Sequence, residues 1–202
     1  MKKVLISQRH DKISELNEWR DSLDNNWSFF IHELNLIPIL APNNKEVLNK
    51  LLKELKPDYI ILSGGNDVDF PHKRSIAEKI ILEYSIEFNL PVVGVCHGMQ
   101  FLNYFFGGTL ISCTGHVNSY IDLEGSWAIK WNISKVNSFH EFGINKSSLS
   151  TQFKPLAWSN DGIIKAIKHK TLPWLGIMWH PEREFPFKSF DIKIFENLFD
   201  IK

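Results

Sequence analysis

Short apolar runs alternate along this chain with longer segments in which apolar residues recur at helical spacing. Five runs have the length of buried strands: Val4–Ile6, Ile37–Leu40, Tyr59–Leu62, Val92–Val95 and Leu175–Met178. Four segments have the helical period: Ile13–Leu23, Lys45–Leu55, Ile76–Phe88 and Phe187–Phe199. Continuous apolar strands that alternate with amphipathic helices predict an α/β fold with a mostly parallel central sheet flanked by helices.

The residues between these segments support the same organisation. Asn35 stands where a helix end needs a residue that tolerates the left-handed conformation, and Pro42 closes the strand that follows. Residues 109–170 are richer in Ser, Thr and Asn, which predicts short antiparallel strands and loops there. Because no repeat, low-complexity tract or linker interrupts the chain, we expect residues 1–202 to form one domain.

Composition narrows the class of protein. Of the 202 residues, 44% are hydrophobic and 23% are charged, which is ordinary for a globular protein and excludes a disordered chain. Lys plus Arg and Asp plus Glu both number 23, so no basic excess favours a nucleic-acid partner. Two cysteines are too few for a disulfide framework, and no apolar run reaches membrane-spanning length. We therefore expect a cytoplasmic protein without a membrane partner.

The sequence around Cys96 carries the clearest chemical signal. The apolar run Val92–Val95 leads into the pattern Gly-x-Cys-x-Gly, and a helical pattern follows at once. Small residues two positions before and after a nucleophile are typical of a strained turn between a strand and a helix. Such a turn places the thiol at a helix N-terminus, which favours the thiolate. A buried structural cysteine is the alternative, and Cys113, which lacks this context, is assigned to that class.

A base for this thiol is predicted far downstream. The apolar run Leu175–Met178 ends shortly before His180, and Glu182 follows after a proline. His180 could take the thiol proton while Glu182 orients its imidazole. A third element, Ser63-Gly64-Gly65-Asn66-Asp67, follows another strand and could bring a backbone N–H close to a substrate carbonyl. Taken separately, the His-Pro-Glu segment would be interpreted as a surface loop and the segment 63–67 as a simple turn.

In this order, the three elements resemble the class I glutamine amidotransferase superfamily and, within it, the γ-glutamyl hydrolase branch. The resemblance extends to further segments along the chain: Arg74 and Glu78, Gly107-Gly108-Thr109-Leu110, Val136–His140, Ser159–Gly162 and Trp179–Glu182. It implies a three-layer fold in which Cys96 is the nucleophile and His180 and Glu182 are its partners. It also implies that the backbone amides of Gly65 and His97 form the oxyanion hole, and that the glutamyl group is bound by Gln100, Asn137, Ser138, Phe139 and His140.

The chain departs from the family pattern on the side where the leaving group is expected. Glu141-Phe142 stands where the family usually has Gln two residues after the His140 position, and Lys165 stands where it often has Glu. We expect Lys165, Arg9 and His10 to favour an anionic, nucleotide-sized leaving group through charge-assisted hydrogen bonds. A further hypothesis assigns Trp127 and Trp131 to stacking on a base.

The sequence therefore predicts a thiol hydrolase that cleaves a small-molecule γ-glutamyl amide to glutamate without a metal or cofactor. Two alternatives from other classes remain. One is a glutaminase subunit that delivers ammonia to a separate synthase, and the other is a binding protein that has lost catalysis. Hydrolysis of a different γ-glutamyl amine, such as γ-glutamyl-γ-aminobutyrate, also stays open. The partners considered are the small-molecule substrate and a second copy of the chain, as a homodimer.

Overall fold

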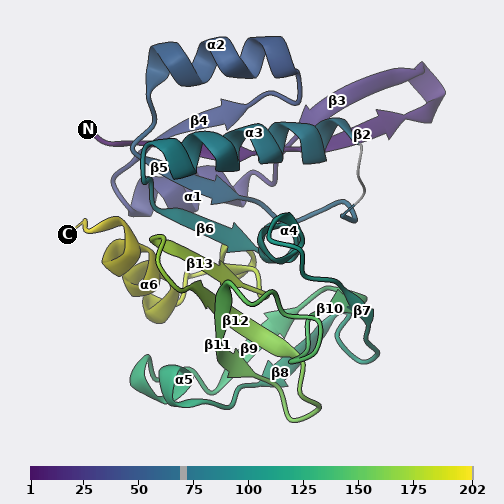
Figure 1. Cartoon of the computed structure of the whole chain (residues 1–202), viewed down its shortest axis with the longest axis vertical. Coiled ribbons are helices and arrows are strands. Elements are labelled where there is room, and N and C mark those ends of the chain that lie inside the picture. Colours follow the sequence, from purple (N-terminus) through teal and green to yellow (C-terminus); the bar gives the residue numbers. More distant parts are fainter. Residues whose placement is uncertain (69–71, 202) are drawn as a thin grey trace.

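The computed structural model describes residues 1–68 and 72–201. Its central sheet contains β1 (Lys3–Ser7), β4 (Ile37–Ala41), β5 (Tyr59–Leu62), β6 (Val92–Val95), β11 (Phe153–Trp158), β12 (Ile164–His169) and β13 (Trp174–Ile177). Their order across the sheet is β11-β12-β13-β6-β5-β1-β4 (Figure 1). The five strands from β13 to β4 are parallel, and β12 and β11 extend the sheet by antiparallel pairing. The predicted mostly parallel α/β sheet is confirmed.

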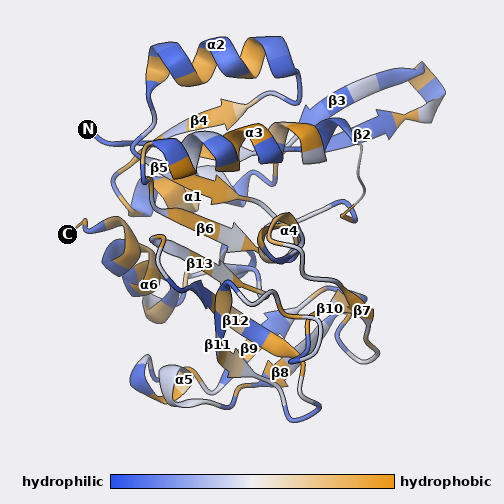
Figure 2. Ribbon diagram, viewed as in Figure 1, coloured by the Kyte–Doolittle hydropathy of each residue, from blue (hydrophilic) through white to orange (hydrophobic). Residues whose placement is uncertain are grey.

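Helices cover both faces of this sheet. One face carries α1 (Asn26–Glu33), α5 (Ser126–Lys130) and α6 (Ser189–Phe199), and the other carries α2 (Lys45–Leu55), α3 (Lys73–Glu87) and α4 (His97–Phe105). Successive strand residues alternate between the two cores: Val4 and Ile6 face the first, and Leu5 faces the second. Because both faces are covered, the central strands are mostly apolar, and β5 and most of β6 appear orange in Figure 2. This gives the three-layer arrangement.

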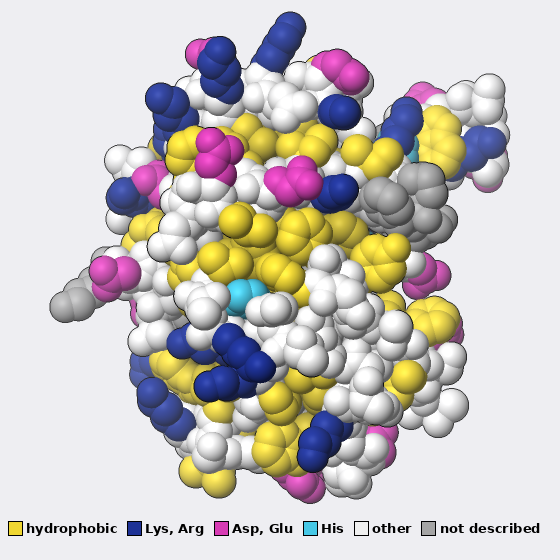
Figure 3. All heavy atoms as spheres, in the orientation of Figure 1, with side chains coloured by type: hydrophobic (Ala, Val, Ile, Leu, Met, Phe, Trp, Pro, Cys, Tyr) yellow, Lys and Arg dark blue, Asp and Glu magenta, His cyan; other side chains and the backbone are white. Residues whose placement is uncertain are grey.

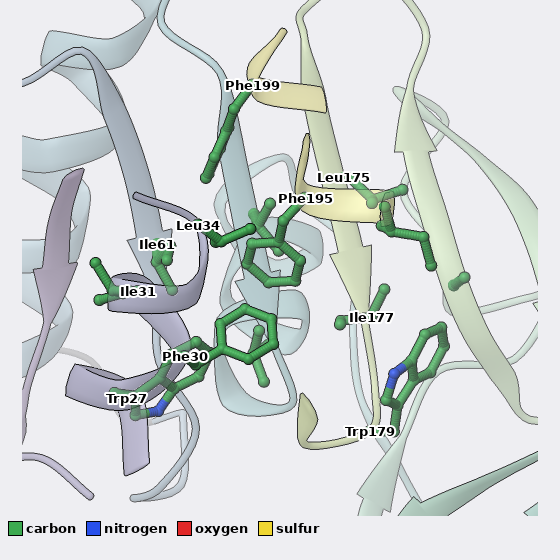
Figure 4. Close-up of a cluster of buried hydrophobic side chains, with 14 of the residues drawn as sticks. Trp27, Phe30, Ile31, Leu34, Ile61, Leu175, Ile177, Trp179, Phe195 and Phe199 are labelled. Atoms are coloured by element: carbon green, nitrogen blue, oxygen red, sulfur yellow. The ribbon is translucent and has the colours of Figure 1, made fainter. Parts of the chain in front are cut away.

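The core on the α1 and α6 face is rich in aromatic rings. Phe30 of α1 and Phe195 of α6 meet edge to face at a centroid separation of 4.9 Å (Figure 4). Trp127 and Trp131 are partly buried against the same core, and Trp127 lies 6.3 Å from the ring of Trp179. These tryptophans therefore contribute to the core, and neither lines the two cavities beside His180, so the structure gives the stacking hypothesis no support.

The segment predicted as a helix over Ile13–Leu23 is instead a β-hairpin. Strand β2 (Arg9–Ile13) pairs antiparallel with β3 (Glu18–Ser22) around a short 3-10 helix (Ser14–Leu16), and the pair projects from the body in Figure 1. Asn17 reverses the chain with φ of 46°. The apolar residues that imitated a helical period remain largely exposed, as Leu16 and Trp19 do. The periodicity was therefore misleading, because it did not mark a buried face.

The second half of the chain adds short antiparallel ladders, as predicted. Strand β7 (Ile111–Ser112) pairs with β10 (Phe142–Gly143), and β8 (Ser119–Asp122) pairs with β9 (Lys135–Ser138).

At the edge of the central sheet opposite β11, strand β4 is less buried than its apolar sequence predicts, since Ile37 is 42% exposed and Leu40 is 49% exposed. No helix of the described residues is both long and apolar enough to cross a bilayer.

The parallel strands present their carboxyl ends at one edge of the sheet. Strand β1 lies between β4 and β5, so the chain leaves β1 toward one side and later returns to the other. Crevices form at such a reversal, outside the carboxyl ends of the strands. Four segments follow these strand ends directly: Gln8-Arg9, Ser63–Asn66, Cys96-His97 and Met178–His180. The topology thus gathers the segments that the sequence singled out.

Candidate active site

Cys96 occupies a strained turn between β6 and α4. Its φ and ψ angles are 51° and −103°, a conformation that residues with a side chain rarely adopt. Its backbone N–H donates to the carbonyl of Ile177 on the neighbouring strand at 2.8 Å, and its own carbonyl accepts from the N–H of Gln100 at 3.0 Å. Bonds on both sides hold the strained residue in place. The thiol lies at the N-terminus of α4, and Cys96 is 6% exposed.

The flanking glycines are required by close packing, as predicted. A Cβ atom at Gly94 would lie 2.6 Å from the carbonyl carbon of Gly98, and one at Gly98 would collide with the carbonyl oxygen of Leu62. Helix α4 therefore starts directly against the ends of β5 and β6. Any larger residue at either position would push the helix away and move Cys96.

His180 and Glu182 meet beside this turn. Nδ1 of His180 lies 2.7 Å from Oε1 of Glu182, and both side chains are buried. The other oxygen of Glu182, Oε2, has no hydrogen-bond partner among residues 1–68 and 72–201. Burial lowers the pKa of His180, but the adjacent Cys96 sulfur and the Glu182 carboxylate outweigh burial and raise this pKa to about 9. The arrangement therefore favours the imidazolium form of His180.

Two neighbours fix the position of His180. The backbone N–H of His180 donates to Oδ1 of Asn137 at 2.8 Å, and Nδ2 of Asn137 donates to the carbonyl of His180 at 2.9 Å. On the opposite side, a Cβ atom at Gly64 would lie 2.5 Å from Cε1 of the imidazole. Asn137 is thus engaged with the His180 backbone, whereas the sequence assigned it to the glutamyl pocket.

The loop after β5 lies against the cysteine turn. Gly65 has φ of 111°, a conformation that favours glycine, and a Cβ atom there would lie 2.5 Å from Cγ of Arg9. Both the backbone conformation and the close packing therefore require glycine at this position. Gly65 and Cys96 line the same cavity. The amide of His97 belongs to the first turn of α4, where no helix carbonyl is available to accept from it. Gly65 and His97, the predicted oxyanion donors, therefore lie on segments that border Cys96, and their role stays a prediction.

A buried carboxylate joins the loop to the turn. Glu78 lies at the centre: Oε1 accepts from Nε of Arg74 at 3.0 Å, and Oε2 lies 2.7 Å from Nε2 of His97. Arg74 also donates to the carbonyls of Ser63 at 2.7 Å and Gly64 at 3.2 Å. Burial raises the pKa of Glu78, but Arg74 and His97 overcome this and hold that pKa at about 2. The carboxylate therefore stays ionised and connects the two segments.

A cavity of 360 Å³ opens over Cys96 and contains most of the predicted glutamyl-binding positions. Gln100, Phe139 and His140 line it together with Cys96. Gln100 donates from Nε2 to the carbonyl of Phe142 at 2.7 Å, which holds the opposite wall. Ser138 is fully buried behind that wall and does not line the cavity. A larger cavity of 860 Å³ lies between α2 and α3, where hydrophobic side chains reach the surface in Figure 3, but neither a thiol nor an imidazole lines it.

Lys165 does not face a leaving group, contrary to the expectation from sequence. It is 1% exposed, and its ammonium lies 2.7 Å from Nε2 of His140, 2.9 Å from Nδ1 of His116 and 3.2 Å from Oγ of Ser138. An ammonium has three donors, so these neighbours occupy all of them. Burial lowers the pKa of Lys165 to about 8, and burial together with Lys165 lowers the pKa of His140 to about 3. Lys165 thus fixes the tautomer of a residue in the cavity wall.

Arg9 and His10 separate in the structure. Arg9 lines the Cys96 cavity and pairs with Asp11 at 3.1 Å. His10 points into the base of the hairpin, where it lies 3.0 Å from Asp21 and stacks on Trp19 at 4.6 Å. His10 does not line the Cys96 cavity, so the structure does not support its predicted role in substrate binding.

Sequence reasoning missed Arg183. Arg183 lies one position after Glu182 in a short 3-10 helix (Pro181–Arg183) and lines the Cys96 cavity. Its guanidinium lies 4.3 Å from the centre of the Phe139 ring. A cation directly after His-Pro-Glu was the available signal. Within the described part of the chain, no cluster of three or more His, Cys, Asp or Glu side chains is arranged to hold a metal.

Comparison with known proteins identifies related chains. A family model described as glutamine amidotransferase class-I matches residues 19–200. The chain is 37% identical over 131 residues to a gamma-glutamyl-CDP-amidate hydrolase of Campylobacter jejuni, and the match spans 62% of this chain and 62% of that relative. It is 31% identical over 153 residues to a glutamine-hydrolyzing GMP synthase subunit of Pyrococcus furiosus, covering 74% and 76% of the two chains. A solved glutamine amidotransferase from Thermotoga maritima shares the fold, with a TM-score of 0.67, 15% identity and coverage of 99% and 85%.

Replacing Glu78 by Gln should destabilise the fold and disturb the cysteine turn together. The amide keeps the shape but leaves the buried Arg74 without a counter-charge, so we expect the free energy of unfolding to fall by about 3–5 kcal/mol. Urea denaturation measures this, and alkylation of Cys96 by iodoacetamide should slow. Glu83→Gln on the exposed face of the same helix is the matched control and should change neither. Equal behaviour of the two variants would contradict the role of Glu78.

The buried ammonium of Lys165 predicts a signed pH dependence of stability. Its pKa in the folded protein, about 8, lies below the ordinary value of 10.5, so the unfolded chain binds more protons between these values. The free energy of unfolding of the wild type, relative to Lys165→Met, should therefore rise as pH increases from 8 to 10.5, by up to about 3 kcal/mol. Below pH 8 the difference should be flat. Urea titrations at several pH values measure it, and a falling difference would contradict the assignment.

Proposed function

The chain belongs to the glutamine amidotransferase class-I family, and from this premise we propose that it hydrolyses a γ-glutamyl amide through a thioester on Cys96. The observation that carries the proposal is the strained cysteine turn, at a helix N-terminus, beside an imidazole whose Nδ1 is held by Glu182. That geometry leaves Nε2 of His180 for the thiol and for the substrate nitrogen. Cys96, His180 and Glu182 then act as nucleophile, acid–base group and orienting carboxylate.

In the acylation step, the Cys96 thiolate attacks the γ-carbonyl carbon, and the amides of Gly65 and His97 hold the oxyanion. The C–N bond then breaks as the His180 imidazolium gives its proton to the departing nitrogen. This leaves a γ-glutamyl thioester and a neutral imidazole. His180 next removes a proton from water, the hydroxide adds to the thioester, and glutamate leaves as the thiolate returns. No step requires a metal or a cofactor.

We further propose γ-glutamyl-CDP-amidate as the substrate, with cytidine diphosphoramidate and glutamate as products. The 37% identity to a gamma-glutamyl-CDP-amidate hydrolase supports this choice. The resemblance extends the proposal to a cytoplasmic enzyme that serves phosphoramidate modification of a capsular polysaccharide. A screen of γ-glutamyl amides, read out as glutamate release, tests it. Release from γ-glutamyl-CDP-amidate no faster than from γ-glutamyl-γ-aminobutyrate would overturn the substrate assignment.

A glutaminase subunit is the second candidate function. The 31% identity to a glutamine-hydrolyzing GMP synthase subunit, over 74% of this chain, favours it. Such a subunit releases ammonia from free glutamine and needs a separate synthase to consume it. Glutamine hydrolysis that appears only when a synthase is added would support this candidate over the first. Turnover of γ-glutamyl-CDP-amidate by the purified chain alone would exclude the need for a partner.

Replacing Cys96 by Ala should abolish turnover, because no other group supplies the nucleophile, and the loss should reach at least about a thousandfold in kcat. Glutamate release from the preferred substrate measures this. Cys113→Ala is the matched control: its thiol lies 3.5 Å from Nδ1 of His140, away from the turn, and the change should leave kcat nearly unaltered. A comparable loss in both variants would mean that the nucleophile is wrongly assigned.

His180→Ala and Glu182→Gln should differ in severity. The first removes both proton transfers, whereas the amide of the second still accepts a hydrogen bond but no longer stabilises the imidazolium. We expect kcat to fall by about ten- to a hundredfold more in His180→Ala than in Glu182→Gln. Steady-state kinetics on one substrate compare them. If Glu182→Gln proved harmless, the orienting role given to this carboxylate would be incorrect.

A further inference from the structure

A second cavity adjoins the one that contains Cys96. It measures 310 Å³, and four residues line both cavities: Arg9, Gly65, His180 and Arg183. Beyond them, the second cavity is bounded by the hairpin and the start of α1, through Asp11, Ser22 and Trp27. Its volume lies within the range of small-molecule sites, about 300–1,000 Å³. The imidazole of His180 therefore stands at the junction of two spaces.

The chemistry of amide cleavage assigns one space to each half of the substrate. This step rests on the hydrolysis proposed above. The acyl carbon must reach Cys96, so the glutamyl chain occupies the first cavity, which Gln100 and His140 line. The departing nitrogen must reach His180 to receive its proton. The group attached to that nitrogen consequently extends past the imidazole into the second cavity.

Among the described residues at this junction, only one cation lacks a carboxylate partner. Arg9 is paired with Asp11, whose oxygens accept from the guanidinium at 3.1 Å and 3.2 Å. Arg183 forms no ion pair with any described residue and is exposed, with its guanidinium 4.3 Å from the centre of the Phe139 ring. Contact with a ring face orients a guanidinium while its N–H groups stay free for a planar or tetrahedral anion.

The acidic groups of the second cavity are engaged to different degrees. Glu182 is held by His180, and Asp11 accepts from Ser22 and Asn66 in addition to Arg9. Asp24 accepts from the backbone N–H of Asn26 at 2.9 Å, at the start of α1. Glu182 and Asp11 are thus compensated by cations, whereas Asp24 has no cationic partner among the described residues. Arg183 is the unpaired cation and lines both cavities, whereas Asp24 is the unpaired anion and lines only the second.

We propose that the second cavity is the leaving-group site and that Arg183 is its anion-binding residue, which takes a phosphate or diphosphate carried by the departing nitrogen. Arginine suits this role because its fork of donors matches two phosphate oxygens at once. The contact lies away from the reacting carbon, so it separates substrates by their leaving groups and leaves the chemistry of acyl transfer unchanged. The specificity for anionic leaving groups, which the sequence had attributed to Lys165, Arg9 and His10, is thereby assigned to Arg183.

Paired substrates test this assignment. Arg183→Ala should raise the KM for γ-glutamyl-CDP-amidate by about ten- to a hundredfold, the loss expected for a charge-assisted hydrogen-bond pair. For γ-glutamyl-p-nitroanilide, whose leaving group is uncharged, kcat/KM should stay nearly unaltered. Arg183→Lys should restore part of the KM. Arg20→Ala, an exposed arginine on the far strand of the hairpin that lines neither cavity, is the matched control and should change neither substrate.

Several results would overturn the proposal. An equal loss on both substrates would mean that Arg183 only positions His180, and no loss on either would remove it from recognition. The kcat/KM for γ-glutamyl-putrescine in Asp24→Asn could instead fall further than the kcat/KM for the phosphorylated amide in Arg183→Ala. That result would mean that the site prefers a cationic leaving group.

Failure of the proposed hydrolysis can be distinguished from failure of the anion-site proposal. If the wild type cleaves neither amide, calorimetric titration of CDP into Cys96→Ala protein, with and without Arg183→Ala, still measures the anion site. Binding that is insensitive to Arg183 in that titration would refute the inference independently.

Discussion

The buried ion pair between Arg74 and Glu78 is the interaction on which the geometry of this site depends. Glu78 lies on α3, yet its carboxylate contacts His97 of the cysteine turn, and its partner Arg74 holds the carbonyls of Ser63 and Gly64. One helix therefore sets the distance between the loop after β5 and the turn after β6. The proposed oxyanion donors, the backbone amides of Gly65 and His97, lie far apart in sequence, and this helix connects the two segments that carry them.

The fold was predictable wherever burial decided the pattern. Strands β5 and β6 and helix α2 have the bounds that the sequence predicted, because their residues face a core on one or both sides. The hairpin of β2 and β3 was not predictable from periodicity, since its stability comes from polar contacts such as that of His10 with Asp21. Its apolar positions are exposed, and an exposed apolar residue carries no information on the period of the element.

The residues of the candidate site likewise divide into those that the sequence could predict and those that it could not. Cys96 could be identified from its flanking glycines, because close packing allows no side chain at Gly94 or Gly98 and the sequence therefore has glycine there. Burial of Lys165 left no such trace, since a lysine on a short strand is ordinarily at the surface. Only the three-dimensional arrangement shows that His116, His140 and Ser138 surround its ammonium. Likewise, Asn137 was predicted to touch substrate and instead fixes the backbone of His180.

The central claim is that a γ-glutamyl thioester forms on the cysteine of the strained turn. Rapid acid quench of the protein with γ-glutamyl-CDP-amidate, followed by mass spectrometry of its peptides, measures this directly. The account predicts that the peptide containing Cys96 gains the mass of one glutamyl group, and that the nucleotide product is released before glutamate. Turnover with no adduct on Cys96, or with the adduct on Cys113, would contradict it.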